Sequence, residues 1–229
     1  MNLNTFGGTI KGGDYGVLIV HGNARMYENV TFDTLVVQGI LQAAFCRGRR
    51  IVMEGGMLNC SSRLVSDSLA GHGRISAKQC ICSRRIDLTG EIKTDHGLYV
   101  KTTARVNGLV EAKSLTATDA RITGHATIGE YAEADRLEIR PIRTTMFERF
   151  GMKGYLKPSS IPRITADNVV LCSTISQKIE AGYVSLHDHT HVEKVIFDDD
   201  LRFDRTSSVK LIERRWNEGE YEALQRRAA

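Results

Sequence analysis

The sequence predicts an all-β protein, built as a parallel β-helix with about 17 residues in each coil. A five-residue phrase recurs along the first 140 residues: an apolar residue, any residue, an apolar residue, any residue, then glycine, as in Ile86–Gly90. The glycines of this repeat are 17, 17, 17, 17, 18 and 16 residues apart; they are Gly22, Gly39, Gly56, Gly73, Gly90, Gly108 and Gly124. A fixed period of this kind is typical of a solenoid.

The apolar residues indicate that the repeated element is a strand. They alternate with a period of two, and another apolar residue follows two positions after each glycine, as Ile92 follows Gly90. Seventeen residues are too few for a helical pair or a propeller blade, which need about 33 or more. A single unit cannot bury its apolar face, whereas stacked units share a continuous core. We therefore expect coils about 4.8 Å apart, glycine at a corner where a side chain would be strained, and a one-residue bulge near Gly55 and Gly56.

The pattern divides most of the chain into four regions. Residues 1–13 are polar and contain glycine, which predicts a flexible lead-in. Residues 14–140 hold seven coils. After Pro141 the glycine rhythm ends and bulky apolar residues cluster, so residues 141–165 are interpreted as a cap or linker lobe, with a partner-binding surface as the alternative. Strand alternation returns over residues 166–204, which predicts a second, shorter β-helical portion.

Residues 205–229 are predicted to form a short helical tail. Ser207 or Ser208 can cap the helix, and Val209, Ile212 and Trp216 fall on one helical face. An amphipathic tail of this kind either docks on its own column or binds a partner helix or a membrane.

A second register runs six residues before the glycines. Four successive coils alternate acid and base there: Asp33, Arg49, Asp67 and Arg84. Opposite charges on neighbouring strands stabilise a sheet by about a few tenths of a kcal/mol per pair. We interpret this charge ladder as structural. The alternative is a patch that binds an anionic ligand.

Composition bounds the class of function. Lys and Arg total 31 against 27 Asp and Glu, so the chain lacks the large excess of positive charge that is typical of nucleic-acid-binding proteins. No apolar run approaches the length of a membrane span and no signal-peptide pattern is present, so we expect a cytoplasmic protein with at most peripheral membrane contact. The cysteines, including the Cys80–Cys82 pair, are expected to pack in the core as small apolar residues.

One constellation suggests metal chemistry. His187, His189 and His191 alternate, so on a strand they would share a face and could converge on zinc. Spacings of about 6.7 Å along a straight strand make that convergence awkward, and a solvent-facing row is the competing interpretation. No phosphate-binding loop or nucleophile elbow is present, and we expect no cofactor.

Enzymatic β-helices are the alternative class. Left-handed acyltransferase helices repeat an aliphatic residue every six positions, about 18 residues per coil, whereas this chain repeats one phrase every 17. His72 and His125 flank repeat glycines in different coils and form no obvious pair. Pectin-active β-helices carry clustered carboxylates, and no such cluster is apparent in the sequence.

The repeat resembles the bactofilins, polymer-forming bacterial cytoskeletal proteins. The matching units, such as Leu35–Leu41 and Ile86–Ile92, cover residues 14–140. The stretch from Asn168 through Gly182 to Val195 looks like the C-terminal part of the longer, two-part bactofilins of Gram-positive bacteria. Together these portions cover most of the chain.

The resemblance implies a right-handed β-helix that assembles end to end into nucleotide-free filaments. It implies a scaffold for cell shape, envelope enzymes or flagellar motility, whose partners are other copies, a related paralogue and envelope or flagellar proteins. The commonest bactofilins are a single bare column, so a C-terminal half that caps one end would leave dimers or short oligomers. Because a column end presents unpaired backbone, we expect an assembly interface at the N-terminal coils, formed by Leu18, Val20, Ala24, Leu35, Val37 and Leu41.

Overall fold

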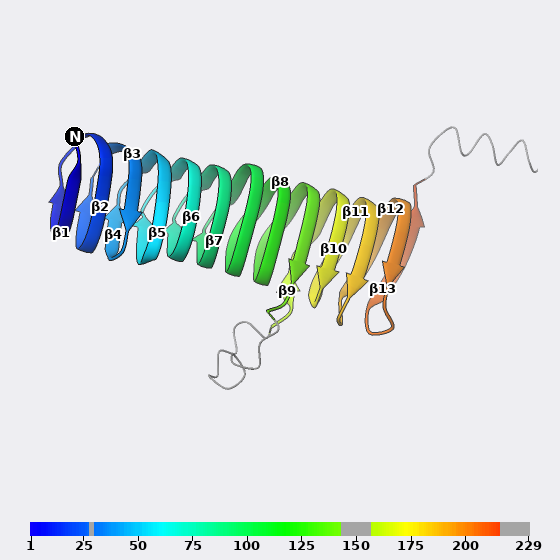
Figure 1. Cartoon of the computed structure of the whole chain (residues 1–229). Helices are drawn as coiled ribbons and strands as arrows, with labels where there is room; N and C mark the ends of the chain where they lie inside the picture. The colour runs from blue at the N-terminus through cyan, green and yellow to red at the C-terminus, as the bar shows by residue number, and fades with distance from the viewer. Residues whose placement is uncertain (28–29, 143–156, 216–229) are drawn as a thin grey trace, which may run out of the picture.

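The computed structural model describes residues 1–27, 30–142 and 157–215, and every regular element in them is a strand. The strands are β1 (Leu3–Ile10), β2 (Gly13–Met26), β3 (Val30–Val37), β4 (Ile40–Ala43), β5 (Cys46–Cys60), β6 (Leu64–Ala77), β7 (Ile81–Thr94), β8 (Gly97–Arg140), β9 (Ser159–Ser160), β10 (Arg163–Cys172), β11 (Thr174–His187), β12 (His191–Phe203) and β13 (Ser208–Arg214). All belong to one sheet that winds into a solenoid of about 12 turns with about 17 residues per turn. Figure 1 shows these coils in single file, with β1 at one end and β13 at the other. The predicted parallel β-helix is therefore confirmed.

Each coil has three short sides, as β7 illustrates. Buried residues come in pairs two positions apart, because alternate side chains of a strand point to the same face. Two or three more exposed residues separate the pairs, and the chain turns there. The three pairs of this coil are Ile81 with Ser83, Ile86 with Leu88, and Ile92 with Thr94.

The core is a stack of equivalent inward residues. One row contains a single residue from each turn: Leu3, Leu18, Leu35, Ile51, Leu69, Ile86, Ala104, Ala120, Leu137, Val169, Val184 and Leu201. The ten inner members are exposed by 2% or less, whereas the end members Leu3 and Leu201 are only half-buried. Burial of each large aliphatic side chain stabilises the fold by about 1.5–3 kcal/mol. The stack therefore stabilises every coil that has a neighbour on both sides.

The repeat glycines form a column at one corner, where successive coils approach too closely for a side chain. A Cβ on Gly90 would overlap the carbonyl oxygen of Gly73, and Gly108 and Gly124 each stand in the same relation to the glycine before them. Gly90 also has φ of +137°, a conformation that residues with a side chain rarely adopt. The predicted bulge is present as well, since the register shifts between Glu54 and Met57.

Residues 1–13 are not the flexible lead-in that the sequence predicts. Leu3–Ile10 is strand β1, which pairs with β2 from Leu3 opposite Leu18 to Ile10 opposite Met26. The stretch is poor in bulky apolar residues because an end coil has a neighbour on one side only. Its first phrase, Leu3 to Gly7, has the repeat spacing but carries Thr5 at the second apolar position.

The division at Pro141 into two β-helical portions is also corrected. Strand β10 pairs with β8, with Val169 opposite Leu137, and on its other side with β11. Strand β9 restores the third side of this turn, because it pairs with both β8 and β11. The described coils on both sides of residues 143–156 thus form one continuous column, and Pro141 stands at the corner position that glycine occupies in earlier coils. Most of the predicted cap, residues 143–156, lies outside the described residues.

Beyond this point the same corner is built without glycine. Ser173, Asp188 and His189 adopt φ of 51°, 51° and 61°, a left-handed conformation that Asp and His tolerate better than most residues. Buried hydroxyls hold these turns in place: Thr190 Oγ1 donates to the His187 carbonyl at 2.6 Å. A polar turn therefore replaces the glycine column in the C-terminal coils.

The predicted helix at the start of the tail is a strand. In β13, Val209 lies opposite Val192 and Ile212 opposite Val195. Both partners are buried although they are three residues apart, because a corner lies between them. This spacing across a corner imitates the spacing of a helical face. Trp216 and the rest of the tail lie outside the described residues.

We predict that Gly90→Ala lowers the free energy of unfolding by about 1–3 kcal/mol or more, the cost of a strained backbone, because its Cβ would overlap the Gly73 carbonyl. Gly129→Ala is the matched control, since its Cβ would meet nothing closer than 3.7 Å, and should change stability by about 0.5 kcal/mol or less. Urea unfolding followed by circular dichroism measures both. Equal effects of the two substitutions would refute the close approach.

Candidate functional sites: open ends and a charged groove

The C-terminal end of the described column exposes apolar side chains. Within the described residues β13 pairs with β12 alone, so its outer edge presents free N–H and C=O groups, a template for another strand. The inward residue Ile212, stacked on Val195, is 46% exposed because β13 is the last described strand of the stack, and Phe203 is 47% exposed. Val209 is half-buried beside them.

The N-terminal end is also open but carries fewer apolar groups. Strand β1 pairs only with β2 in the part of the chain that the structure describes. Phe6 is 77% exposed and stacks on the His21 ring with the centroids 4.7 Å apart. Leu3 is half-buried.

The residues predicted to form an assembly interface at the N-terminal coils are not at the surface. The six residues assigned to it are exposed by 3% or less, since β1 covers the first of them: Leu18, Val20, Ala24, Leu35, Val37 and Leu41. They are interior core residues, and a charge at Val20 would destabilise the fold. The phrase Leu3 to Gly7, with threonine in one apolar position, was the signal for the additional coil.

The predicted charge ladder has the expected register but only one of its ion pairs. Arg49 contacts Asp33 on the preceding coil through Nε at 2.6 Å and Nη2 at 2.8 Å. The pairings on either side also place Asp67 and Arg84 at this position of their coils, yet the described residues show no ion pair between them. Side-chain exposures of 68% and 48% for Arg49 and Asp33 limit this pair to about 1 kcal/mol or less.

A denser set of ion pairs follows the glycine corner instead. The pairs join neighbouring coils: Arg74 with Glu91 at 2.5 Å, Lys93 with Glu111 at 2.6 Å, and Lys113 with Glu130 at 3.1 Å. The hydrogen bond that Lys93 donates to the Glu111 carboxylate raises the pKa of Lys93. Two of these pairs join residues at equal offsets after successive glycines, a regularity that the sequence does contain.

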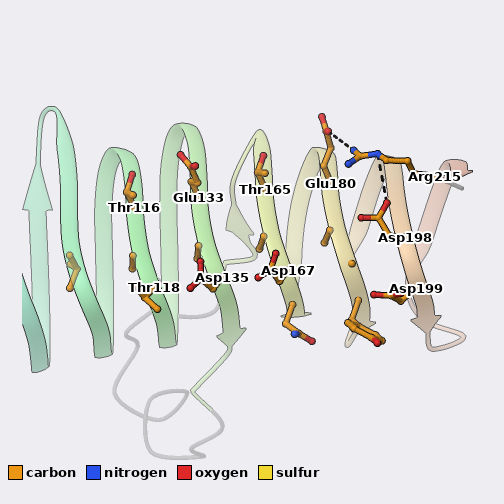
Figure 2. Close-up of a pocket in the computed structure, with 18 of the residues that line it drawn as sticks. Thr116, Thr118, Glu133, Asp135, Thr165, Asp167, Glu180, Asp198, Asp199 and Arg215 are labelled. Carbon is orange, nitrogen blue, oxygen red and sulfur yellow. Dashed lines mark hydrogen bonds and ion pairs between the residues drawn. The ribbon is translucent and has the colours of Figure 1, made fainter. Parts of the chain in front are cut away.

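A groove of about 690 Å³ runs along another corner. Carboxylates from successive coils line it, as Figure 2 shows: Glu133 and Asp135 of β8, Asp167 of β10, Glu180 of β11, and Asp198 and Asp199 of β12. We refer to it as the acidic groove. This cluster was not predicted from the sequence, because Asp135 and Asp167 are 32 residues apart in the chain and align only through the pairing of β8 with β10.

Arg215 partly neutralises the acidic groove. Its guanidinium contacts Glu180 Oε2 at 3.0 Å and Asp198 Oδ1 at 3.7 Å (Figure 2). The hydrogen bond from Lys178, with the added charge of Arg215, lowers the pKa of Glu180. A carboxyl held in its charged form is not suited to act as a general acid.

The three histidines of the predicted row do not share a face. His189 and the intervening Asp188 lie in a left-handed turn, so the chain is not an extended strand there. His187 hydrogen-bonds Ser185 Oγ through Nε2 at 2.7 Å, and His191 hydrogen-bonds Ser208 Oγ through Nδ1 at 2.8 Å. No group of three or more His, Cys, Asp or Glu among the described residues is arranged to hold a metal ion.

The other histidines of interest, His72 and His125, lie three coils apart. His125 is 9% exposed; its Nδ1–H donates to the Lys157 carbonyl at 3.1 Å, and its Nε2 hydrogen-bonds Thr127 Oγ1 at 2.9 Å. His125 thus anchors the chain where it returns to the column ahead of β9. His72 is exposed at the glycine corner.

Comparisons with known proteins add no assignment: the chain matches no protein-family model, no curated protein and no solved structure. The resemblance to the bactofilins therefore depends on the repeat itself. Among the described residues no helix has the length and apolar character to cross a membrane.

We predict that Asp204 stabilises the last corner in a pH-dependent way. It accepts hydrogen bonds from the backbone N–H groups of Asp188, Thr206 and Ser207 at 2.9–3.0 Å, and these hold its pKa well below the usual range. Because the folded pKa is depressed, this contribution is fully present above the unfolded pKa of about 3.9 and is lost as pH falls below it.

The measurement compares wild-type protein with Asp204→Asn by urea unfolding between pH 3 and pH 7. Wild type should be the more stable at pH 5–7, and the difference should shrink below about pH 4. Asp95→Asn, at an exposed carboxylate, is the control and should show little difference. A difference that stays constant down to pH 3 would contradict the role of Asp204.

Proposed function

We propose that this protein is a non-enzymatic, self-assembling scaffold whose columns associate through their ends without a nucleotide. One observation carries the proposal: the last described coil combines an outer strand edge, unpaired within the described residues, with an inward apolar residue, Ile212, that is left half exposed. A second column stacked there would pair the backbone of β13 and bury Ile212, Val209 and Phe203 in one step.

The resemblance to the bactofilins supports the same proposal. Within that family type the scaffold organises envelope, cell-shape or flagellar-motility proteins, and we extend this to the present chain, with a cytoplasmic location and at most peripheral membrane contact. The continuous column adds support, because β10 pairs directly with β8 and β9 pairs with β11, so the described coils on both sides of residues 143–156 form one stack.

The alternatives are an acyltransferase-type β-helix enzyme and a metal-binding protein. They have less support, since His72 and His125 lie three coils apart and the histidines from His187 to His191 diverge at a turn. The acidic groove is the feature on which an enzymatic function would have to be built.

The test is a pair of substitutions in the same strand. Ile212 and Leu211 are 46% and 49% exposed, but Ile212 stacks inward on Val195 whereas Leu211 lies opposite the outward Lys194. Ile212→Glu should raise the concentration needed for assembly at least about tenfold, since about 1.4 kcal/mol suffices for that factor and an unpaired buried carboxylate costs more. Leu211→Glu should have a much smaller effect.

Negative-stain electron microscopy of the full chain, without nucleotide and with a chelator, reads out assembly, and circular dichroism verifies the fold. Filaments from wild type and Leu211→Glu, with separate particles from Ile212→Glu, are the expected result. Filaments from folded Ile212→Glu would exclude the C-terminal end, and separate particles from wild type would exclude self-assembly under these conditions.

A further inference from the structure

Two cysteines lie side by side on the outside of the column. Cys80 and Cys82 flank the fully buried Ile81, so both side chains point away from the core, and both are half-exposed. Their sulfurs are 3.7 Å apart. The expectation that this pair packs in the core is therefore wrong, because Ile81 and not its neighbours occupies the inward position.

The backbone allows the two sulfurs to meet. Residues two apart on an extended chain have Cα atoms roughly 6.6 Å apart, inside the range of roughly 4.4–6.8 Å that disulfides span. The Cys80 carbonyl accepts a hydrogen bond from Leu64 N–H at 2.9 Å, which fixes the chain before the pair. Closure must shorten the sulfur separation from 3.7 Å to about 2.05 Å, chiefly by rotation of the two side chains.

The other cysteines are differently placed. Cys46 is fully buried and Cys60 is 3% exposed, and burial raises the pKa of both thiols. Cys60 Sγ also donates to the Arg63 carbonyl at 3.2 Å. Cys172 is 8% exposed, at the end of β10. Reactive cysteines need solvent access, which only Cys80 and Cys82 have among the five.

We propose that Cys80 and Cys82 are a reversible oxidation site, which closes to an intramolecular disulfide when the protein meets a small-molecule disulfide such as oxidised glutathione. One thiol loses its proton and attacks a glutathione sulfur, which forms a mixed disulfide and releases one glutathione thiolate. The second thiol loses its proton, attacks the protein sulfur and releases the other glutathione. The protein loses two hydrogens, and the oxidant gains two electrons and two protons.

Local electrostatics favour a slow, oxidant-dependent reaction. Burial and the neighbouring Cys80 raise the pKa of Cys82 to about 11, while the positive charge of Arg63 lowers it slightly. The Cys82 thiolate is therefore scarce at neutral pH, and its fraction rises about tenfold per pH unit below this value. The pair should stay reduced until a disulfide reagent is present, and closure should quicken as pH rises.

The oxidised pair would lie beside the surface grooves. Cys82 lines a hollow with Asp67, Arg84 and Tyr99, and that hollow shares Val100, Lys101 and Thr116 with the acidic groove. Closing the disulfide pulls the Cys82 side chain towards Cys80.

The test treats the reduced full chain with oxidised glutathione and measures intact mass, with peptide mapping of the linked residues. Wild type should lose two hydrogens, map the link to Cys80 and Cys82, and recover both thiols with dithiothreitol. Cys80→Ser and Cys82→Ser should each gain one glutathione instead, because the resolving thiol is missing. The Cys80→Ser/Cys82→Ser double variant is the matched control and should remain unchanged.

Serine matches cysteine closely in size, and circular dichroism verifies that each variant is folded. Wild type that retains five free thiols, or that keeps a glutathione adduct without closing it, would overturn the proposal. A glutathione adduct on the double variant would overturn it as well, because the reactive thiol would then be elsewhere.

Discussion

Backbone hydrogen bonding between parallel coils sets a spacing of about 4.8 Å, and the rest of the structure depends on it. At that spacing each inward side chain rests on its counterpart one coil away, so one aliphatic residue must recur at each position, as in the row from Leu18 to Val184. The same spacing brings corner carbonyls into the space that a Cβ would occupy, which requires glycine from Gly22 to Gly124. Ion pairs such as Lys93 with Glu111 also form between coils at this distance.

The sequence was sufficient to predict the fold because this constraint repeats. Period, strand character and the bulge at Gly55 are all local patterns, and the structure confirms them. The errors in the predicted bounds of the β-helix have a common physical origin. They lie where the fixed spacing between coils no longer dictates an apolar residue or a glycine at each position. At the first coil Thr5 occupies an apolar position at a half-covered end, and in the last coils polar left-handed turns replace glycine.

Candidate sites were harder to predict than the fold because they depend on register across interruptions. The Asp33–Arg49 pair could be predicted from the sequence, since its members lie on neighbouring coils with no insertion between them. The acidic groove was not, because residues 142–157 separate Asp135 from Asp167 in sequence but not in space. The prediction that the histidines from His187 to His191 share a face was wrong for a different reason. Alternation indicates a shared face only on a strand, and the chain turns at Asp188.

The direction of the backbone hydrogen bonds has a mechanical consequence. Strands run across the column, so the bonds between coils lie along its axis on all three sides. A pull on the two ends loads the three sides in parallel, while the corners keep successive coils covalently joined. Such a column resists extension at each turn with many bonds at once, and a stack of columns would be weakest at its joints, where only non-covalent contacts transmit the load.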